Sequence, residues 1–321
     1  MELVDDGIVG TVQTVMTATD EGLHEFELGA ASDHSGRRVD ELAGHEVLAL
    51  ELSGGGPWAI VDGKELWRRA EGRWTRVASM GRRRATCLAV TPAGLLMGTA
   101  RAHLLRLEGH QLQPVSGFDA AEGRDTWYTP WGAPADVRSI TAGTDGALYV
   151  NVHVGGVLRS TDGGTTWRPL LDIEHDVHQV YAPAGHRHLV LVAAFDGFGV
   201  SRDGGDTWMW ENEGLHAHYC RAVALAGDTV ILSASTGHHG RRAALYRRAL
   251  EAGTFERCAD GLPEWFSDNV DTGCVAAQGD TVVIGTEDGC LFASADGGPN
   301  VVLPLAPTDA PPTRARLSLK T

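Results

Sequence analysis

Two stretches of the chain, Ser160-Thr161-Asp162-Gly163-Gly164-Thr165-Thr166-Trp167 and Ser201-Arg202-Asp203-Gly204-Gly205-Asp206-Thr207-Trp208, carry the same residue at six positions. Ser294-Ala295-Asp296-Gly297-Gly298 repeats the first half of the pattern without the tryptophan. Asp before Gly-Gly favours a tight turn, because the carboxylate accepts backbone N–H groups and glycine adopts positive φ easily. The tryptophan that follows begins a strand and is expected to pack between neighbouring sheets. We therefore interpret Asp162 and Asp203 as structural rather than catalytic carboxylates.

These turns belong to longer units, each of which reads as four short strands separated by glycine-containing turns. The units recur every 35–50 residues or so, a spacing typical of β-propeller blades. Complete blades are predicted at residues 44–77, 84–115, 136–170, 177–210, 219–257 and 271–305.

The two ends of the chain account for one further blade. Residues 11–40 match only the second and third strands of a blade, and residues 313–320 alternate like a strand. We expect this tail to supply the missing first strand and close the ring, because closure removes exposed sheet edges. The sequence thus predicts one all-β domain, residues 1–321, folded as a seven-bladed propeller of four-stranded antiparallel blades. Six blades, with residues 11–40 as an appendage, is the alternative.

Composition excludes several functional classes. A formal net charge of −15 argues against nucleic-acid binding, which needs a positive field. The first residues lack the features of a signal peptide, and no apolar run approaches the roughly 20 residues that a membrane helix needs. The five cysteines are scattered and form no CxxC pair, which favours a reducing, cytoplasmic location.

The repeated motif resembles the Asp-box, S-x-D-x-G-x-T-W, of sialidase-like (BNR-repeat) propellers. The chain is similar in repeat form to photosystem II assembly factors and to WD40-like and YVTN repeat proteins. The resemblance implies that ligands bind near the central channel, on the face away from the Asp-boxes. A sialidase would also need three arginines around a carboxylate and a Tyr–Glu nucleophile pair, but its F/Y-R-I-P motif is absent. Residues available for these roles are Arg138, Arg221 and Arg241, and Tyr219 or Tyr128 with Glu213.

Histidine, arginine and aromatic residues are expected to converge at the channel mouth on that face. Arginine forks suit carboxylates, and aromatic rings suit the walls of a pocket, so a small or anionic ligand is predicted. The histidines predict binding that varies between about pH 5 and 8. The predicted ligand-binding residues are Arg138, Arg221, Trp127, Trp131, Phe195, Tyr219, Trp265 and His238.

A metal site is a further prediction for the same mouth. Aligning the first strands places His178, Cys220, Cys87, Arg138 and Thr272 at equivalent positions, with His153 beginning a neighbouring loop. His153, His178 and His218 are the predicted ligands of zinc, copper or iron, with His216 or Cys220 as alternatives to His218. Streptogramin lyases, which are propellers with a His/Glu metal site, imply a comparable role for Glu287.

Two classes of function follow from this pocket. A bound metal would activate water or polarise a carbonyl, which predicts a metal-dependent hydrolase or lyase. The alternative is a non-catalytic scaffold that presents the same face to a protein partner. A sialidase-type glycoside hydrolase is the least favoured option.

Overall fold

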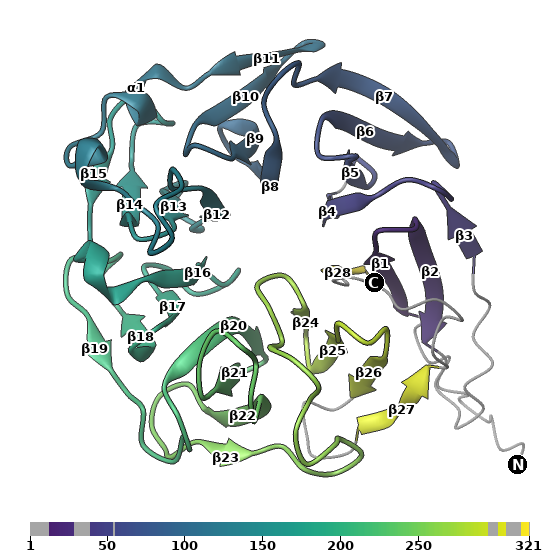
Figure 1. Ribbon diagram of the computed structural model, residues 1–321, viewed down its shortest axis with the longest axis vertical. Helices are drawn as coiled ribbons and strands as arrows, with labels where there is room; N and C mark the ends of the chain where they lie inside the picture. Colours follow the sequence, from purple (N-terminus) through teal and green to yellow (C-terminus); the bar gives the residue numbers. More distant parts are fainter. Residues whose placement is uncertain (1–12, 29–38, 54, 295–300, 306–315, 321) are drawn as a thin grey trace, which may run out of the picture.

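The structure is a computed structural model that describes residues 13–28, 39–53, 55–294, 301–305 and 316–320. Its strands form seven four-stranded sheets arranged like blades around a common axis (Figure 1). The predicted seven-bladed all-β propeller is confirmed, and the six-bladed alternative is wrong. Among the described residues, no helix is long and apolar enough to cross a membrane.

Each complete blade begins with its inner strand and ends with its outer strand. The first three complete blades are β4 (Val47–Glu51), β5 (Trp58–Val61), β6 (Glu65–Ala70) and β7 (Arg73–Ser79); β8 (Ala85–Thr91), β9 (Gly94–Thr99), β10 (Leu104–Glu108) and β11 (Gln111–Pro114); and β12 (Val137–Ala142), β13 (Leu148–Val152), β14 (Gly156–Ser160) and β15 (Arg168–Pro169). Short helices between blades are α1 (Ser116–Asp119), η1 (Arg124–Thr126) and η2 (Ile173–His175).

The next three blades follow the same plan. They are β16 (Val177–Tyr181), β17 (Val190–Ala194), β18 (Gly197–Ser201) and β19 (Met209–Trp210); β20 (Tyr219–Ala226), β21 (Thr229–Ser235), β22 (Ala244–Ala249) and β23 (Glu256–Arg257); and β24 (Val275–Gln278), β25 (Thr281–Gly285), β26 (Leu291–Ser294) and β27 (Val301–Leu305).

The seventh blade joins the two ends of the chain. Its strands from the axis outward are β28 (Arg316–Lys320), β1 (Gln13–Ala18), β2 (Leu23–Leu28) and β3 (Val39–Glu41). Strand β28 pairs antiparallel with β1. The predicted closure of the ring by the C-terminal strand is therefore confirmed.

Side chains between neighbouring blades form the core. Trp167, which follows the first Ser-x-Asp-Gly-Gly turn, is only 7% exposed and belongs to a cluster that joins two blades. Its ring lies edge-on to Phe118, with centroids 5.2 Å apart, and its Nε1 donates to the carbonyl oxygen of Gly164 at 3.0 Å. This placement confirms the packing predicted for the tryptophan of the repeat.

The turn at Ser201–Thr207 is held by a network around Asp203. The carboxylate accepts the Thr207 N–H at 2.9 Å and its hydroxyl at 2.6 Å, while the Ser201 hydroxyl donates to it at 2.8 Å. Gly205, at φ 96°, lies in a region that glycine adopts without strain. The turn at Ser160–Thr166 repeats these bonds. The hydrogen bonds from Thr207 lower the pKa of Asp203 to about 2. The third turn, at residues 294–298, lies largely outside the described residues.

Asp203→Ala is expected to destabilise the fold by roughly 1–2 kcal/mol, because it removes the three charge-assisted bonds that fix the turn. Urea unfolding at pH 7 measures the effect, and Asp228→Ala in an exposed turn is the control. Because the folded pKa of Asp203 lies below its ordinary value of 3.8, its contribution is complete above about pH 4 and disappears as the pH falls toward 2. Equal unfolding midpoints for Asp203→Ala and Asp228→Ala would contradict this role.

Candidate functional site at the mouth of the channel

A shared irregularity of the inner strands builds the site. In five inner strands the pairing register shifts near the first residue, as in a β-bulge. A bulge leaves an extra residue unpaired and redirects its side chain. The bulged residues are Leu48, Thr86, Arg138, His178 and the pair Arg221–Ala222. All inner strands begin on one face of the ring, here called the mouth face, so these side chains meet there. The Ser-x-Asp-Gly-Gly turns lie on the other face, here called the turn face.

The register corrects the predicted alignment of first strands. Arg138 and His178 are equivalent, as predicted, but Thr86 occupies the position assigned to Cys87. Arg221 likewise replaces Cys220. A shift of one residue turns a side chain to the other side of a strand, so both cysteines instead pack in the core between blades. Burial raises the pKa of Cys220, so its thiol stays protonated.

A cavity of about 620 Å³ opens at the mouth face, and four of the bulged residues line it: Leu48, Thr86, Arg138 and Arg221. This volume lies within the range of small-molecule sites. Acidic residues predicted for no role also line it, namely Asp136, Asp176 and Asp271. The sequence-predicted residues that line it are Arg138, His153, Arg221, Trp131, Phe195, Tyr219 and His238.

Two predicted wall residues, Trp127 and Trp265, are not among the side chains that line the cavity. The Trp127 ring packs against Phe118 with centroids 5.7 Å apart, as part of the core beneath. The Trp265 ring is covered by the Arg257 guanidinium, which lies 4.1 Å from its centroid. Neighbouring side chains therefore hold both rings away from the mouth.

Arg138, His153 and Asp176 form a connected row at the mouth. Nη2 of Arg138 lies 2.8 Å from Nδ1 and 3.2 Å from Nε2 of His153. Because a guanidinium only donates hydrogen bonds, a ring nitrogen must accept, and the shorter distance favours Nδ1. The Nε2 of His153 also lies 3.5 Å from Oδ1 of Asp176, an oxygen that accepts no hydrogen bond among the described residues. Asp176 has a φ of 40°, which is uncommon for a residue other than glycine.

Arg221, by contrast, already has its counter-ion. Its Nε and Nη2 both lie close to Oδ1 of Asp271, at 2.6 and 2.5 Å, and its Nη1 donates to the Tyr219 hydroxyl at 3.0 Å. Burial on its own would lower the pKa of Arg221, but the charges and hydrogen bonds of Asp271 and Tyr219 together raise it. No comparable ion pair joins Arg138 to a carboxylate among the described residues.

Burial sets the charges of the row. It lowers the pKa of Arg138 to about 10, assisted by the like charge of Arg221, so Arg138 stays charged at neutral pH. Burial would raise the pKa of Asp176, but His178 beside it and the nearby charges lower it to about 2. Burial and then Arg138 lower the pKa of His153 to about 3. At neutral pH the row therefore holds a cation, a neutral ring and an anion.

The three predicted metal ligands are not brought together: His153 and His178 both lie beside Asp176, but His218 does not join them. Arg138 and Asp176 face the two ring nitrogens of His153. His178 is fully buried, and its Nδ1 lies 2.6 Å from the carbonyl oxygen of Cys220, to which it must donate. His218 is exposed and does not line the cavity. In the part of the chain that the structure describes, no three His, Cys, Asp or Glu side chains are grouped to hold a metal ion.

His153 is not the source of the pH-sensitive binding that was expected between pH 5 and 8. Its pKa is about 3, so its ring is neutral over this range, and burial also lowers the pKa of His178. Because the folded pKa of His153 lies below its ordinary value of 6.5, the folded chain binds fewer protons than the unfolded chain below pH 6.5.

Stability is therefore expected to fall as the pH drops below 6.5, by up to about 1.4 kcal/mol per pH unit for each such histidine. His153→Gln keeps an acceptor for Arg138 and should flatten this slope. Urea unfolding between pH 4.5 and 7.5 compares the two chains, with the exposed His218→Gln as the control. Parallel pH profiles for His153→Gln and the unaltered chain would contradict a neutral His153.

Asp176 is the central residue that the sequence analysis missed. Its signal was present in a short repeat, since Asp136-Val137-Arg138 and Asp176-Val177-His178 both place an aspartate two residues before a bulged side chain. The sialidase-type clamp is not assembled either, because Arg241 does not line the cavity that Arg138 and Arg221 share.

Comparisons with known proteins agree with the fold. No protein-family model and no curated protein matches the chain. A solved structure described as YCF48 bound to D1 peptide is 13% identical, with TM-score 0.57, over 86% of this chain and 91% of that chain. The WD40 β-propeller domain of Doa1 is 14% identical, with TM-score 0.61, over 84% of each chain. An ancestral GH74 enzyme is 14% identical, with TM-score 0.58, over 85% of this chain and 38% of the chain of that enzyme. At these identities the likeness establishes the propeller fold alone.

Proposed function

We propose that this propeller binds a carboxylate-bearing ligand at the channel mouth, with Arg138 as the anchor. One observation carries the proposal. The Arg138 guanidinium lines the cavity as a charged group and donates to the neutral ring of His153, but it pairs with no carboxylate among the described residues. A buried cation without a counter-ion is costly, and a ligand carboxylate matches a guanidinium with two parallel hydrogen bonds.

The aromatic side chains of the rim favour a ligand that joins its carboxylate to an apolar group. Trp131 is 66% exposed and lies with its centroid 4.8 Å from that of His153. Phe195 is 55% exposed and lies edge-on to Tyr219. Large aromatic side chains exposed beside a charged group are typical of binding sites. We propose binding rather than metal-assisted hydrolysis or elimination, because neither ring nitrogen of His153 is left for a metal.

The carboxylate can belong to a small molecule or to the C-terminus of a protein partner. Exposed Tyr128, together with Trp131 and Phe195, favours the second possibility, a scaffold that receives a peptide end. The similar propeller YCF48 is described as bound to a peptide. We also infer that the repeats are of the Asp-box class, since both complete turns share one hydrogen-bond pattern. As the cysteine pattern indicates, we place the protein in the cytoplasm.

Titration calorimetry of the full chain tests the proposal with 3-phenylpropanoate as the probe. We expect this carboxylate to bind, and its alcohol and amine analogues, 3-phenylpropanol and 3-phenylpropylamine, to bind at least tenfold more weakly at the mouth. Short peptides ending in phenylalanine, with a free or an amidated C-terminus, separate a peptide ligand from a small one. Absence of any preference for the carboxylate in both series would reject the proposal.

A further inference from the structure

The channel continues beyond the mouth into a second cavity of about 460 Å³. Side chains of the inner strands β4, β8, β12, β16, β20 and β24 line it. Arg138 and Thr272 line both cavities, and so mark the boundary between them. The second cavity therefore lies along the axis, on the side of the turn face.

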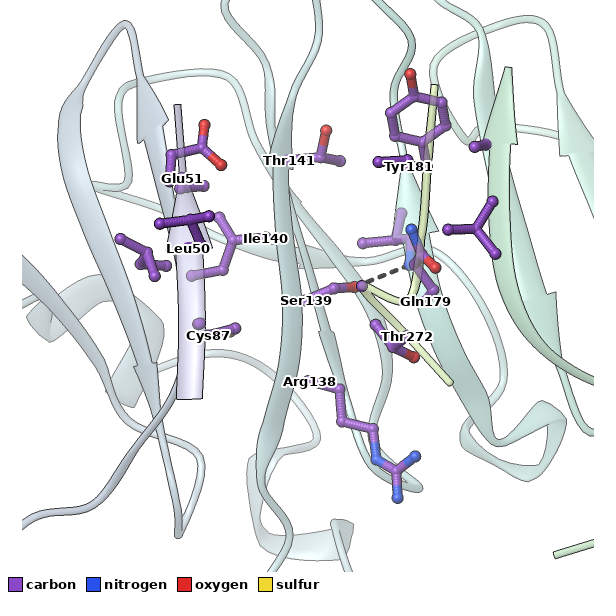
Figure 2. A pocket seen from close by; sticks show the side chains of 18 of the residues that line it. Leu50, Glu51, Cys87, Arg138, Ser139, Ile140, Thr141, Gln179, Tyr181 and Thr272 are labelled. Atoms are coloured by element: carbon purple, nitrogen blue, oxygen red, sulfur yellow. Dashed lines mark hydrogen bonds between the residues drawn. The ribbon is translucent and has the colours of Figure 1, made fainter. Parts of the chain in front are cut away.

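The polar groups of this second cavity are unevenly distributed. Among the described residues that line it, the charged ones are Arg138 and Glu51. Figure 2 shows Arg138 at one end of the view, pointing away, and Glu51 at the other end, level with Thr141 and Tyr181. Glu51 and Tyr181 are the last residues of β4 and β16. The carboxyl group thus stands at the end of the channel nearest the turn face.

Most polar groups along this wall already have partners. Gln179 donates to the carbonyl oxygen of Val223 and accepts its N–H, both at 3.1 Å. Ser139 accepts the N–H of Val180 at 2.9 Å. The exceptions are Glu51, whose one hydrogen bond among the described residues is a 3.5 Å contact from the Val90 N–H, and the Tyr181 hydroxyl, which has none there.

Glu51 is therefore a carboxyl group in the channel that pairs with no cation among the described residues that line it. Burial raises its pKa to about 7. The other titratable groups among these described lining residues are Tyr181, whose pKa burial also raises, and Arg138 at the far end. Apolar side chains such as Leu50 and Ile140 separate the two ends. A cation with N–H donors and an apolar body would satisfy Glu51 and cover these walls.

We propose that the turn-face end of the channel binds an aliphatic ammonium ion, with Glu51 as its counter-ion and Tyr181 as its second contact. The ammonium group donates to the carboxylate and lies beside an aromatic ring that attracts cations. Calcium and magnesium fit less well, because they require about six oxygen ligands and the cavity offers one carboxylate. This site does not depend on the carboxylate site at the mouth.

Because binding is linked to the ionisation of Glu51, the affinity of the site should depend on pH. Only the ionised form of Glu51 pairs with the ammonium ion, so binding releases a proton below about pH 7. The affinity for an amine that is fully protonated throughout should therefore increase about tenfold from pH 6 to pH 8.

Calorimetry of the full chain with hexylamine, which is an ammonium ion in this range, tests the proposal. We expect binding that strengthens from pH 6 to pH 8, weakens at least tenfold in Glu51→Gln, and weakens less in Tyr181→Phe, which keeps the ring. Glu108→Gln, on the exposed end of β10, is the matched control and should bind normally. Circular dichroism verifies that each variant is folded. The affinity for hexanol measures how much the apolar chain contributes to binding without the charge.

A failure of the ammonium site can be distinguished from a failure of the carboxylate site at the mouth. Glu51→Gln should leave 3-phenylpropanoate binding unchanged, since Arg138 and its neighbours are intact. Hexylamine that does not bind, that binds Glu51→Gln and the unaltered chain equally, or that binds no better than hexanol would overturn the ammonium site.

Discussion

A chain that ends at residue 313, and so lacks β28, is expected to lose its folded monomeric state. The deleted strand pairs with β1 at five positions, from Thr14 opposite Lys320 to Ala18 opposite Arg316. At about 1 kcal/mol for each net hydrogen bond, the loss is roughly 5 kcal/mol, similar to the whole stability of many domains. It also uncovers Val15 and Met16, which are buried in the intact ring, and leaves a sheet edge that favours aggregation.

Size-exclusion chromatography and thermal unfolding of the truncated chain measure this effect. We expect oligomers or a melting temperature lower by more than about 10 °C, given the several degrees associated with each kcal/mol. A peptide of residues 313–321 added to the truncated chain should restore part of the stability, and a peptide with Ser318→Pro, which lacks one N–H donor, should restore less. A truncated monomer with the same melting temperature as the intact protein would show that β28 does not hold the ring closed.

Replacing Arg138 by glutamine is expected to weaken 3-phenylpropanoate binding by about 30- to 150-fold, which corresponds to a charge-assisted pair of roughly 2–3 kcal/mol. Arg138→Lys keeps the charge but loses the planar fork, so about a tenfold loss is expected. The same calorimetric titration measures all three chains.

The matched control for this series is Arg84→Gln. Arg84 also lines the mouth cavity, but its guanidinium is 54% exposed and pairs with Glu46 at 3.1 Å. An exposed pair of this kind contributes little, so a change of about twofold is expected. If Arg84→Gln and Arg138→Gln weakened binding equally, the mouth would be a general basic surface without an anchor at Arg138.

The fold could be predicted because its determinants are local and repeated. The turn around Asp203 needs only residues from Ser201 to Trp208, and the blade spacing follows from counting such units. Closure of the ring required one non-local step, the assignment of residues 313–320 as the missing strand. That step succeeded because residues 11–40 offered an incomplete blade.

The site could be predicted only in part, for two physical reasons. Bulges insert one residue into the inner strands. An assignment that assumed regular alternation of side chains along these strands therefore placed Cys87 and Cys220 at positions that Thr86 and Arg221 occupy. Loop side chains follow no period, which is why the burial of Trp127 was not predicted. The equivalence of Arg138 and His178, two bulged residues in neighbouring blades, was predicted correctly.

The pairing of β28 with β1 also constrains how the protein is made. Synthesis proceeds from the N-terminus, so β1 emerges from the ribosome long before the strand that will cover its inner edge. The six complete blades can form one after another from neighbouring segments, but the ring stays open until β28 is released. We therefore expect the nascent chain to bind holdase chaperones through this open edge until β28 has been made.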